Sequence, residues 1–179
     1  MDWINTKIDW NKPIIIMSAQ FNGVFLRMDG SGITAASGSG AGTVNCQKTL
    51  SATAQFMARE TGKDIFSFES VAFPGVYLRM DGGNVRSKSN AGAGKVNCQF
   101  GAREWEQFRL HKQQDGSYTI ESAAFPNVYL RMDGSNPKGK EEGFGTVNCQ
   151  SGAASYERFY IHNITENGMM QDLLKKLIK

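Results

Sequence analysis

Hydrophobic and polar residues alternate along several short stretches of the chain. The segment Val76–Asp81 reads VYLRMD, with its aliphatic residues at even positions and its aromatic and polar residues at odd positions. A period of two is typical of a half-buried strand. We therefore expect the even positions to point toward a core and the odd positions to point outward. Similar patterns predict strands over 96–99, 107–111 and 117–122.

Two short tags, RMDG and VNCQ, each occur three times. Their first residues are Arg27, Arg79 and Arg131 for RMDG, and Val44, Val96 and Val147 for VNCQ. The spacing is 52 residues throughout, except for a final interval of 51 in the second tag. A repeat of this kind predicts three copies of one structural unit. Each copy holds four predicted strands, twelve in all.

The segment that leads into each RMDG strand has the composition of a tight turn. It reads Phe21–Gly23 in the first copy, Phe73–Gly75 in the second and Phe125–Asn127 in the third. Pro presets φ at the second turn position, and Gly or Asn tolerates positive φ at the third. We therefore predict type II turns with positive φ at residues 23, 75 and 127.

One four-stranded copy cannot bury its apolar face alone, so the three copies must close around a shared core. A propeller needs at least about four blades, and a solenoid needs dissimilar terminal repeats. The sequence therefore predicts an all-β fold, a β-trefoil with pseudo-threefold symmetry and a short C-terminal amphipathic helix. The predicted limits are 1–12 for an N-terminal extension, 13–164 for the trefoil, about 13–68, 69–120 and 121–164 for its repeats, and 165–179 for the helix.

The repeat resembles that of a fascin-type β-trefoil domain. The resemblance covers about residues 13–164 and is carried by GVYLRMDG at 75–82, VNCQ at 96–99, WEQF at 105–108 and DGSYTIES at 115–122. The pattern is more distantly similar to fibroblast growth factor and hisactophilin trefoils, and it lacks the Gln-x-Trp signature of ricin-type lectins. The resemblance implies a non-enzymatic lectin-like or fascin-like module, and the fascin side of it implies binding or crosslinking of actin.

Composition and charge exclude several classes of function. The 179 residues carry a net charge of +3 that is spread along the chain, which argues against nucleic acid as a partner. No apolar run approaches the roughly 18 residues of a membrane span, so membrane insertion is not expected. The first residues, MDWIN, lack the basic and apolar regions of a secretory signal. We expect a cytoplasmic protein, with release without a signal peptide as an alternative.

The link between the two tags differs among the copies, whereas the tags do not. It spans residues 31–43, 83–95 and 135–146, and it is nearly neutral in the first copy and charged in the other two. The polar tag residues offer the donors and acceptors that sugar hydroxyls require. They are the predicted ligand-binding set: Arg27, Asp29, Asn45, Gln47, Arg79, Asp81, Asn97, Gln99, Arg131, Asp133, Asn148 and Gln150.

Three interpretations of these tags are open: a structural one, a functional one, and a mixture in which the tag shapes the loop and the loop meets the ligand. In the structural one, Arg–Asp pairs and the amides of Asn and Gln bond the backbone where long loops leave the strands. In the functional one, three equivalent polar clusters bind glycans or glycoconjugates, and a neighbouring aromatic ring of Phe25, Tyr77 or Tyr129 provides a platform for a sugar ring. Three weak sites on one rigid body would gain avidity on a multivalent surface.

The chain offers little for catalysis or for metal binding. Cys46, Cys98 and Cys149 have inward parity and are expected to be buried free thiols, which favours a reducing compartment. The only two histidines, His111 and His162, occupy equivalent positions and are expected at the surface.

The repeated acids Glu69 and Glu121 are also expected on strand surfaces. No phosphate-binding or dinucleotide motif appears. We predict no catalytic residue, no metal and no cofactor.

The tail at 165–179 has apolar residues at helical spacing beside three lysines. Packing of this helix on the barrel or on the N-terminal segment is the first interpretation. A membrane-surface, dimer or partner helix, and a linker into a further domain, are the alternatives.

These observations predict a recognition module, a lectin-like carbohydrate-binding β-trefoil with up to three equivalent sites. The alternatives are a fascin-like actin-binding protein, which would need a homodimer through the terminal segments to bundle filaments, and the targeting domain of a larger toxin or hydrolase.

Overall fold

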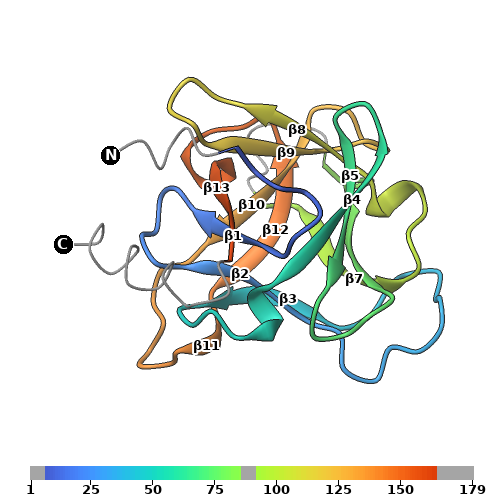
Figure 1. Ribbon diagram of the computed structural model, residues 1–179, viewed down its shortest axis with the longest axis horizontal. Coiled ribbons are helices and arrows are strands. Elements are labelled where there is room, and N and C mark those ends of the chain that lie inside the picture. The colour runs from blue at the N-terminus through green and yellow to red at the C-terminus, as the bar shows by residue number, and fades with distance from the viewer. Residues whose placement is uncertain (1–6, 86–91, 165–179) are drawn as a thin grey trace.

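The computed structural model describes residues 7–85 and 92–164, and these residues form an all-β fold (Figure 1). The predicted C-terminal helix at 165–179 lies outside the described residues. The strands form one continuous sheet. Their bounds are β1 Ile14–Ser18, β2 Phe25–Asp29, β3 Thr43–Gln47, β4 Phe56–Gly62, β5 Ile65–Ser70, β6 Val76–Asp81, β7 Gly94–Phe100, β8 Phe108–Lys112, β9 Tyr118–Ser122, β10 Val128–Asp133, β11 Glu142–Phe144, β12 Thr146–Ser151 and β13 Phe159–Asn163.

The sheet contains the same four-stranded unit three times. In each unit the RMDG strand pairs antiparallel with the VNCQ strand, as β2 with β3, β6 with β7 and β10 with β12. The first and last strands, β1 and β13, also pair with each other. The strands β5 and β9 cross the predicted repeat limits at 68/69 and 120/121, because each of them is the first strand of its unit. Strand β11 was not predicted, and it lies within the long loop of the third repeat.

A short 3₁₀ turn follows the VNCQ strand in every repeat. These turns are η2 (Ala52–Ala54), η3 (Glu104–Glu106) and η4 (Ser155–Glu157). One residue separates each turn from the next strand. That strand begins with a fully buried phenylalanine, which is Phe56, Phe108 or Phe159. The turn therefore occupies an equivalent place against the core in all three repeats.

The alternation of the RMDG strands is confirmed for the apolar positions. Val76, Leu78 and Met80 are each at most 1% exposed, and the same positions in the other repeats are also buried. Cys98 is fully buried with them. These residues belong to one apolar cluster that runs through all three repeats, as expected where no single repeat can build its own core.

The predicted turns before the RMDG strands are confirmed. Gly23, Gly75 and Asn127 have φ of 72°, 85° and 66°. In each turn the N–H three residues after the phenylalanine donates to the phenylalanine carbonyl at 3.0–3.1 Å. The positive φ explains why only Gly or Asn stands at this position.

The long loops pass from one repeat to the next. Ala41, in the loop after β2, exchanges two backbone hydrogen bonds with Cys98 of β7, each 2.8 Å long. Gly94 in the second repeat lies opposite Cys149 of β12, and Phe144 in the third lies opposite Cys46 of β3. Figure 1 shows the first of these loops, in light blue, reaching the side of the barrel where β7 lies. Each repeat therefore covers the VNCQ strand of its successor, and the third covers the first.

The N-terminal extension is fixed to the barrel at its end nearest β1. The Asn163 side chain accepts a hydrogen bond from the Asp9 N–H at 2.8 Å and donates one to the Asp9 carbonyl at 2.7 Å. Trp10 packs on Phe66, with ring centroids 4.6 Å apart. Among residues 7–85 and 92–164, no helix has the length and hydropathy needed to cross a membrane.

Candidate functional site

The predicted polar tags form an internal network that repeats with the fold. In every repeat the tag arginine donates from Nη1 to the side-chain oxygen of the asparagine opposite it on the paired strand. The N···O distances are 3.1 Å for Arg27–Asn45, 3.2 Å for Arg79–Asn97 and 3.4 Å for Arg131–Asn148. The network is therefore a property of the strand pair rather than of one copy.

The tag aspartates fix the start of each long loop. Oδ1 of Asp29 accepts the Ser31 N–H at 3.1 Å, and Oδ1 of Asp133 accepts the Ser135 N–H at 3.0 Å. The hydroxyl and N–H of Ser31 lower the pKa of Asp29 from its usual value, and those of Ser135 do the same for Asp133. This is the loop-bracing role of the structural interpretation.

The tag glutamine of the second repeat fixes the loop that arrives from the first. Gln99 accepts the Ser37 N–H at 2.9 Å through Oε1, and its Nε2 donates to the Ser37 carbonyl. Asn97 adds a hydrogen bond from Nδ2 to the Ser39 carbonyl at 3.0 Å. Two side chains of the second repeat thus bind the backbone of the first.

The twelve predicted site residues are less accessible than their outward parity suggests. Four of them are buried, namely Gln47, Arg79, Asn97 and Gln99. The other eight are half-buried, namely Arg27, Asp29, Asn45, Asp81, Arg131, Asp133, Asn148 and Gln150.

The expectation that all the tag residues point into solvent is wrong for the buried four, because polar residues and a loop from the neighbouring repeat cover them. The proposed aromatic platform at Phe25 is wrong as well, because this ring is 3% exposed and packs with Ile15, Met17 and Ala54.

A groove of about 340 Å³ lies beside the tags of the second repeat. Its lining residues come from the loop of the first repeat and from β6, β7 and the turn η3 of the second, namely Ser37, Gly38, Arg79, Gln99, Arg103, Glu104, Trp105 and Glu106. It is thus built at the junction of two repeats, and it contains two of the predicted site residues.

Trp105 forms one wall of this groove. The guanidinium carbon of Arg79 lies 4.5 Å from the centroid of the indole. The ring also meets Phe125 of the next repeat edge to face, with centroids 5.2 Å apart. These contacts hold a half-buried aromatic ring in one orientation at the groove.

The polar floor of the groove carries a buried ion pair. Nε of Arg79 lies 3.8 Å from Oε1 of Glu106, and the side chains of both residues are 3% exposed. Glu106 also accepts the Arg103 N–H at 2.8 Å. Burial raises the pKa of Glu106, although the hydrogen bond from the Arg103 N–H and the charge of Arg79 oppose the rise.

The third repeat reproduces this arrangement. The guanidinium of Arg131 lies over the ring of Tyr156 at 4.9 Å, and its Nε lies 3.7 Å from Oε1 of Glu157. Tyr156 meets Phe21 of the first repeat edge to face at 5.1 Å. The aromatic residue, the acid and the arginine therefore recur together in two of the three repeats.

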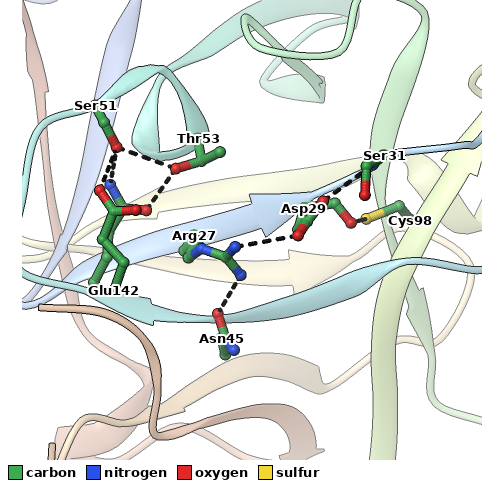
Figure 2. A network of polar contacts seen from close by, with 9 residues as sticks. Arg27, Asp29, Ser31, Asn45, Ser51, Thr53, Cys98 and Glu142 are labelled. Atoms are coloured by element: carbon green, nitrogen blue, oxygen red, sulfur yellow. Dashed lines mark hydrogen bonds and ion pairs between the residues drawn. The ribbon is translucent and has the colours of Figure 1, made fainter. Parts of the chain in front are cut away.

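The first repeat departs from this pattern. Thr53 and Ala54 stand where the others have an aromatic residue and a glutamate. Arg27 pairs with Asp29 at 3.2 Å instead, and its buried Nε has no hydrogen-bond partner within the described chain. Figure 2 shows Arg27 between Asp29 and Asn45.

A carboxylate from the third repeat accepts hydrogen bonds from hydroxyl groups just before the turn η2 of the first repeat. Oε1 of Glu142 accepts a hydrogen bond from Thr49 at 2.5 Å. It also accepts one from Ser51 at 2.9 Å (Figure 2). These hydrogen bonds lower the pKa of Glu142. The first repeat therefore presents a polar, internally bonded turn instead of an aromatic wall.

The sequence-based site lacked the residues of the 3₁₀ turns. Trp105–Glu106 and Tyr156–Glu157 recur at a spacing of 51 residues, the interval that also separates Gln99 from Gln150. This recurrence was the signal in the sequence that could have indicated the turn residues. The turn residues do not alternate with a period of two, so a search for alternating strands does not find them.

The repeated acids outside the groove have structural partners. Glu69 accepts the Gly75 N–H at 2.9 Å, and Glu121 accepts the Asn127 N–H at 2.7 Å. His111 is exposed and lies 2.9 Å from Glu121. His162 is half-buried and stacks on Tyr160, at the edge of the core. No group of three potential metal ligands occurs among the residues that the structure describes.

The three cysteines are buried and free, as predicted. Each Sγ lies close to the backbone carbonyl of the tag aspartate in the preceding repeat, for example 3.5 Å from Cys149 to Asp81. Burial raises the pKa of each thiol to about 12. They therefore serve as packing groups rather than as nucleophiles.

Several solved structures share this fold at low sequence identity. One is a mosquitocidal holotoxin, with a TM-score of 0.65 and 13% identity, where the match covers 92% of this chain and 19% of the holotoxin chain. Another is the designed threefold-symmetric protein ThreeFoil, with a TM-score of 0.63 and 14% identity, where the match covers 87% of this chain and 100% of ThreeFoil. A third is the ricin B-like lectin of Macrolepiota procera, solved with lactose, with a TM-score of 0.62 and 13% identity, where the match covers 89% of this chain and 100% of the lectin. The β-trefoil fold is thereby confirmed, and the chain spans about a fifth of the holotoxin.

Comparison by sequence identifies the family. No curated protein matches the chain. Residues 14–143 match the alpha-L-arabinofuranosidase B (ABFB) domain, which covers the first two repeats and about half of the third. The predicted assignment to the β-trefoil superfamily is thus confirmed, and the chain belongs to the alpha-L-arabinofuranosidase B domain family.

Proposed function

We propose that this chain is a non-enzymatic carbohydrate-binding module whose principal site is the groove beside Trp105. The observation that carries the proposal is the composition of that groove. A half-buried indole forms one wall, and Arg79, Gln99 and Glu106 form a polar floor. An aromatic ring packs against the C–H face of a sugar, while polar side chains beside it match the sugar hydroxyls.

The number of sites follows from what the repeats share. The second and third repeats carry the aromatic residue and the acid, as Trp105–Glu106 and Tyr156–Glu157, whereas the first carries Thr53 and Ala54. We therefore propose two sites instead of three equivalent ones. In each, the tag arginine orients the aromatic ring. Two sites on one body would raise the avidity for a surface that displays many copies of a sugar.

The comparisons support this class of ligand. One similar structure was solved with lactose, and another, a Polyporus squamosus lectin (TM-score 0.60, 13% identity, 88% of this chain and 50% of that one), with a sialylated galactose epitope. The family name refers to an enzyme that acts on arabinofuranosides.

The groove contains Glu104 and Glu106, but Glu106 is buried and held by Arg79 and by the Arg103 N–H. These contacts give Glu106 a structural role in the groove. Actin binding and a homodimer find no support in the family or in the similar structures, and they remain predictions.

Membership of a family named for a hydrolase, and the larger size of the holotoxin, favour a role in delivering an attached catalytic or toxic domain to a glycan surface. Cytoplasmic localisation remains a prediction as well.

The proposal can be tested with a glycan array that includes terminal arabinofuranosides, lactose and sialylated lactosamine. We expect binding by the folded wild type, and a loss of at least about tenfold in affinity for Trp105→Ala, because an anchoring aromatic side chain is removed. Tyr156→Ala should give a smaller loss that adds to the first.

The matched control is Thr53→Ala, which changes the equivalent turn of the first repeat and should leave affinity unchanged. The absence of any bound glycan, or equal effects of Trp105→Ala and Thr53→Ala, would contradict the proposal.

A further inference from the structure

We propose that the sugar specificity of the groove beside Trp105 is set by the long loop of the first repeat, not by the loop of the second repeat, which supplies the aromatic wall. This inference rests on the proposed function, since it concerns the same groove. It is based on the backbone pairing between the long loop of each repeat and the VNCQ strand of the next repeat.

The first loop is bound to the second repeat by three separate sets of contacts. Gln99 bonds both the N–H and the carbonyl of Ser37. Asn97 bonds the Ser39 carbonyl at 3.0 Å, and Ala41 forms a two-bond bridge with Cys98. The loop therefore has a fixed position relative to the second repeat, although it belongs to the first.

The same loop forms the wall of the groove that faces the aromatic turn. Ser37 and Gly38 line the groove together with Trp105. Gln99 is therefore a positioning residue, because it holds Ser37 in that wall. Among the described residues of the second repeat's own long loop, 83–85 and 92–95, none lines the groove.

The first repeat shows the effect of a different incoming loop. There the loop of the third repeat brings in Glu142, whose carboxylate accepts hydrogen bonds from the hydroxyls of Thr49 and Ser51. Figure 2 shows Glu142 beside Ser51. At the second repeat the incoming loop brings Ser37 and Gly38, which leave a groove open. At the first repeat the incoming Glu142 takes up the hydrogen bonds of the turn hydroxyls.

The loop sequences differ among the repeats, as expected if the loop selects the ligand. The clamp by Gln99 and Asn97 belongs to the second repeat, since Gln47 in the first bonds its own turn instead.

The inference is tested with two matched variants that add the same charge to two loops. Ser37→Glu changes the incoming loop, and Asn84→Glu changes the exposed start of the second repeat's own loop. The ¹⁵N-labelled protein is titrated with methyl α-L-arabinofuranoside and with lactose, and the Trp105 indole N–H reports on the groove. We expect Ser37→Glu to change the ratio of the two affinities at Trp105 at least about tenfold, and Asn84→Glu to leave it within about twofold.

A second measurement tests the clamp in the sugar-free protein. Gln99→Ala should speed hydrogen exchange of the Ser37 amide at least about tenfold, and Gln99→Glu, which keeps the acceptor for this amide, should restore part of the protection. Unchanged exchange in Gln99→Ala overturns the inference.

The inference is also overturned if wild type binds a sugar at Trp105 and Ser37→Glu leaves the affinity ratio unchanged. In that case the proposed function stands. If wild type binds no sugar, the proposed function fails and the inference fails with it.

Discussion

The second and first repeats share their backbone pattern and their RMDG and VNCQ tags, yet they surround the tag arginine differently. In the second, the Arg79 side chain is 3% exposed and lies between Trp105 and Glu106. In the first, the Arg27 side chain is 16% exposed and pairs with the more accessible Asp29. The same tag is therefore part of a groove in one repeat and of an internally bonded surface in the other.

This difference separates what supports the fold from what supports a ligand site. The Arg–Asn bond and the Asx turn of the tag aspartate occur in the first repeat, which has no aromatic wall. They must therefore serve the fold, since they persist without the groove. The residues that change between the repeats are those of the 3₁₀ turn and of the incoming loop. We infer that recognition resides in these variable residues.

The largest effect is expected from one substitution made in both repeats. Arg79→Met leaves Glu106 buried without its cationic partner, which should cost about 3–5 kcal/mol of unfolding free energy. Arg27→Met removes a partly exposed pair with Asp29 and should cost about 1 kcal/mol or less. Chemical denaturation of the two variants gives both values. Equal losses would mean that the two arginines have the same role.

A smaller effect should distinguish how closely the incoming loops fit. A Cβ at Gly40 would lie 2.5 Å from Oδ1 of Asn97 and 2.7 Å from the Cys98 carbonyl oxygen, whereas at Gly143 the nearest atoms are 4.0 Å away. Both glycines have positive φ, of 67° and 74°.

Gly143→Ala should therefore cost about 1 kcal/mol from the backbone conformation alone, and Gly40→Ala about 2–4 kcal/mol because of the additional overlap. Thermal denaturation of both variants measures the difference. A cost for Gly143→Ala as high as that for Gly40→Ala would show that the first repeat holds its loop as tightly as the second.

The smallest effect concerns the loop-bracing carboxylate of the first repeat. Because Ser31 lowers the pKa of Asp29 in the folded state, ionised Asp29 stabilises the fold above its unfolded pKa of about 3.9, and this contribution is lost as the pH falls through the lower folded value. Ser31→Ala should raise the pKa of Asp29 toward its usual value and move acid unfolding to higher pH.

Carboxyl ¹³C NMR titration measures this pKa, with Asp133 as the internal control because its partner is Ser135. An unchanged Asp29 would show that Ser31 does not set its pKa.

The sequence predicts the fold well because the threefold repeat gives the number of units and local patterns give the strands and turns within each unit. Alternation identifies Leu78 and Met80 as core residues, and the turn composition identifies the positive φ of Gly75 and Asn127. Alternation does not reveal what lies over the outward face of a strand. Gln99 is buried because Ser37, 62 residues earlier, covers it, and no periodicity within β7 encodes that contact.

The candidate site was predicted in part for the same reason. Arg79 and Gln99, both selected from the tags, do line the groove. Trp105 lies in a 3₁₀ turn, where side chains follow neither the strand period nor the helical one, so only its recurrence as Tyr156 could have indicated it. The incoming loop contacts a different repeat from the one to which it belongs. Such a contact depends on how the three units close around the core, so no pattern within one repeat predicts it.

Crystals of the wild-type chain soaked separately in methyl α-L-arabinofuranoside and in lactose would show where sugar binds. We expect sugar density against Trp105, within contact of Ser37 or Gly38, and none at the Thr53 turn of the first repeat. Sugar bound at Thr53 as strongly as at Trp105, or bound only away from both turns, would contradict this expectation.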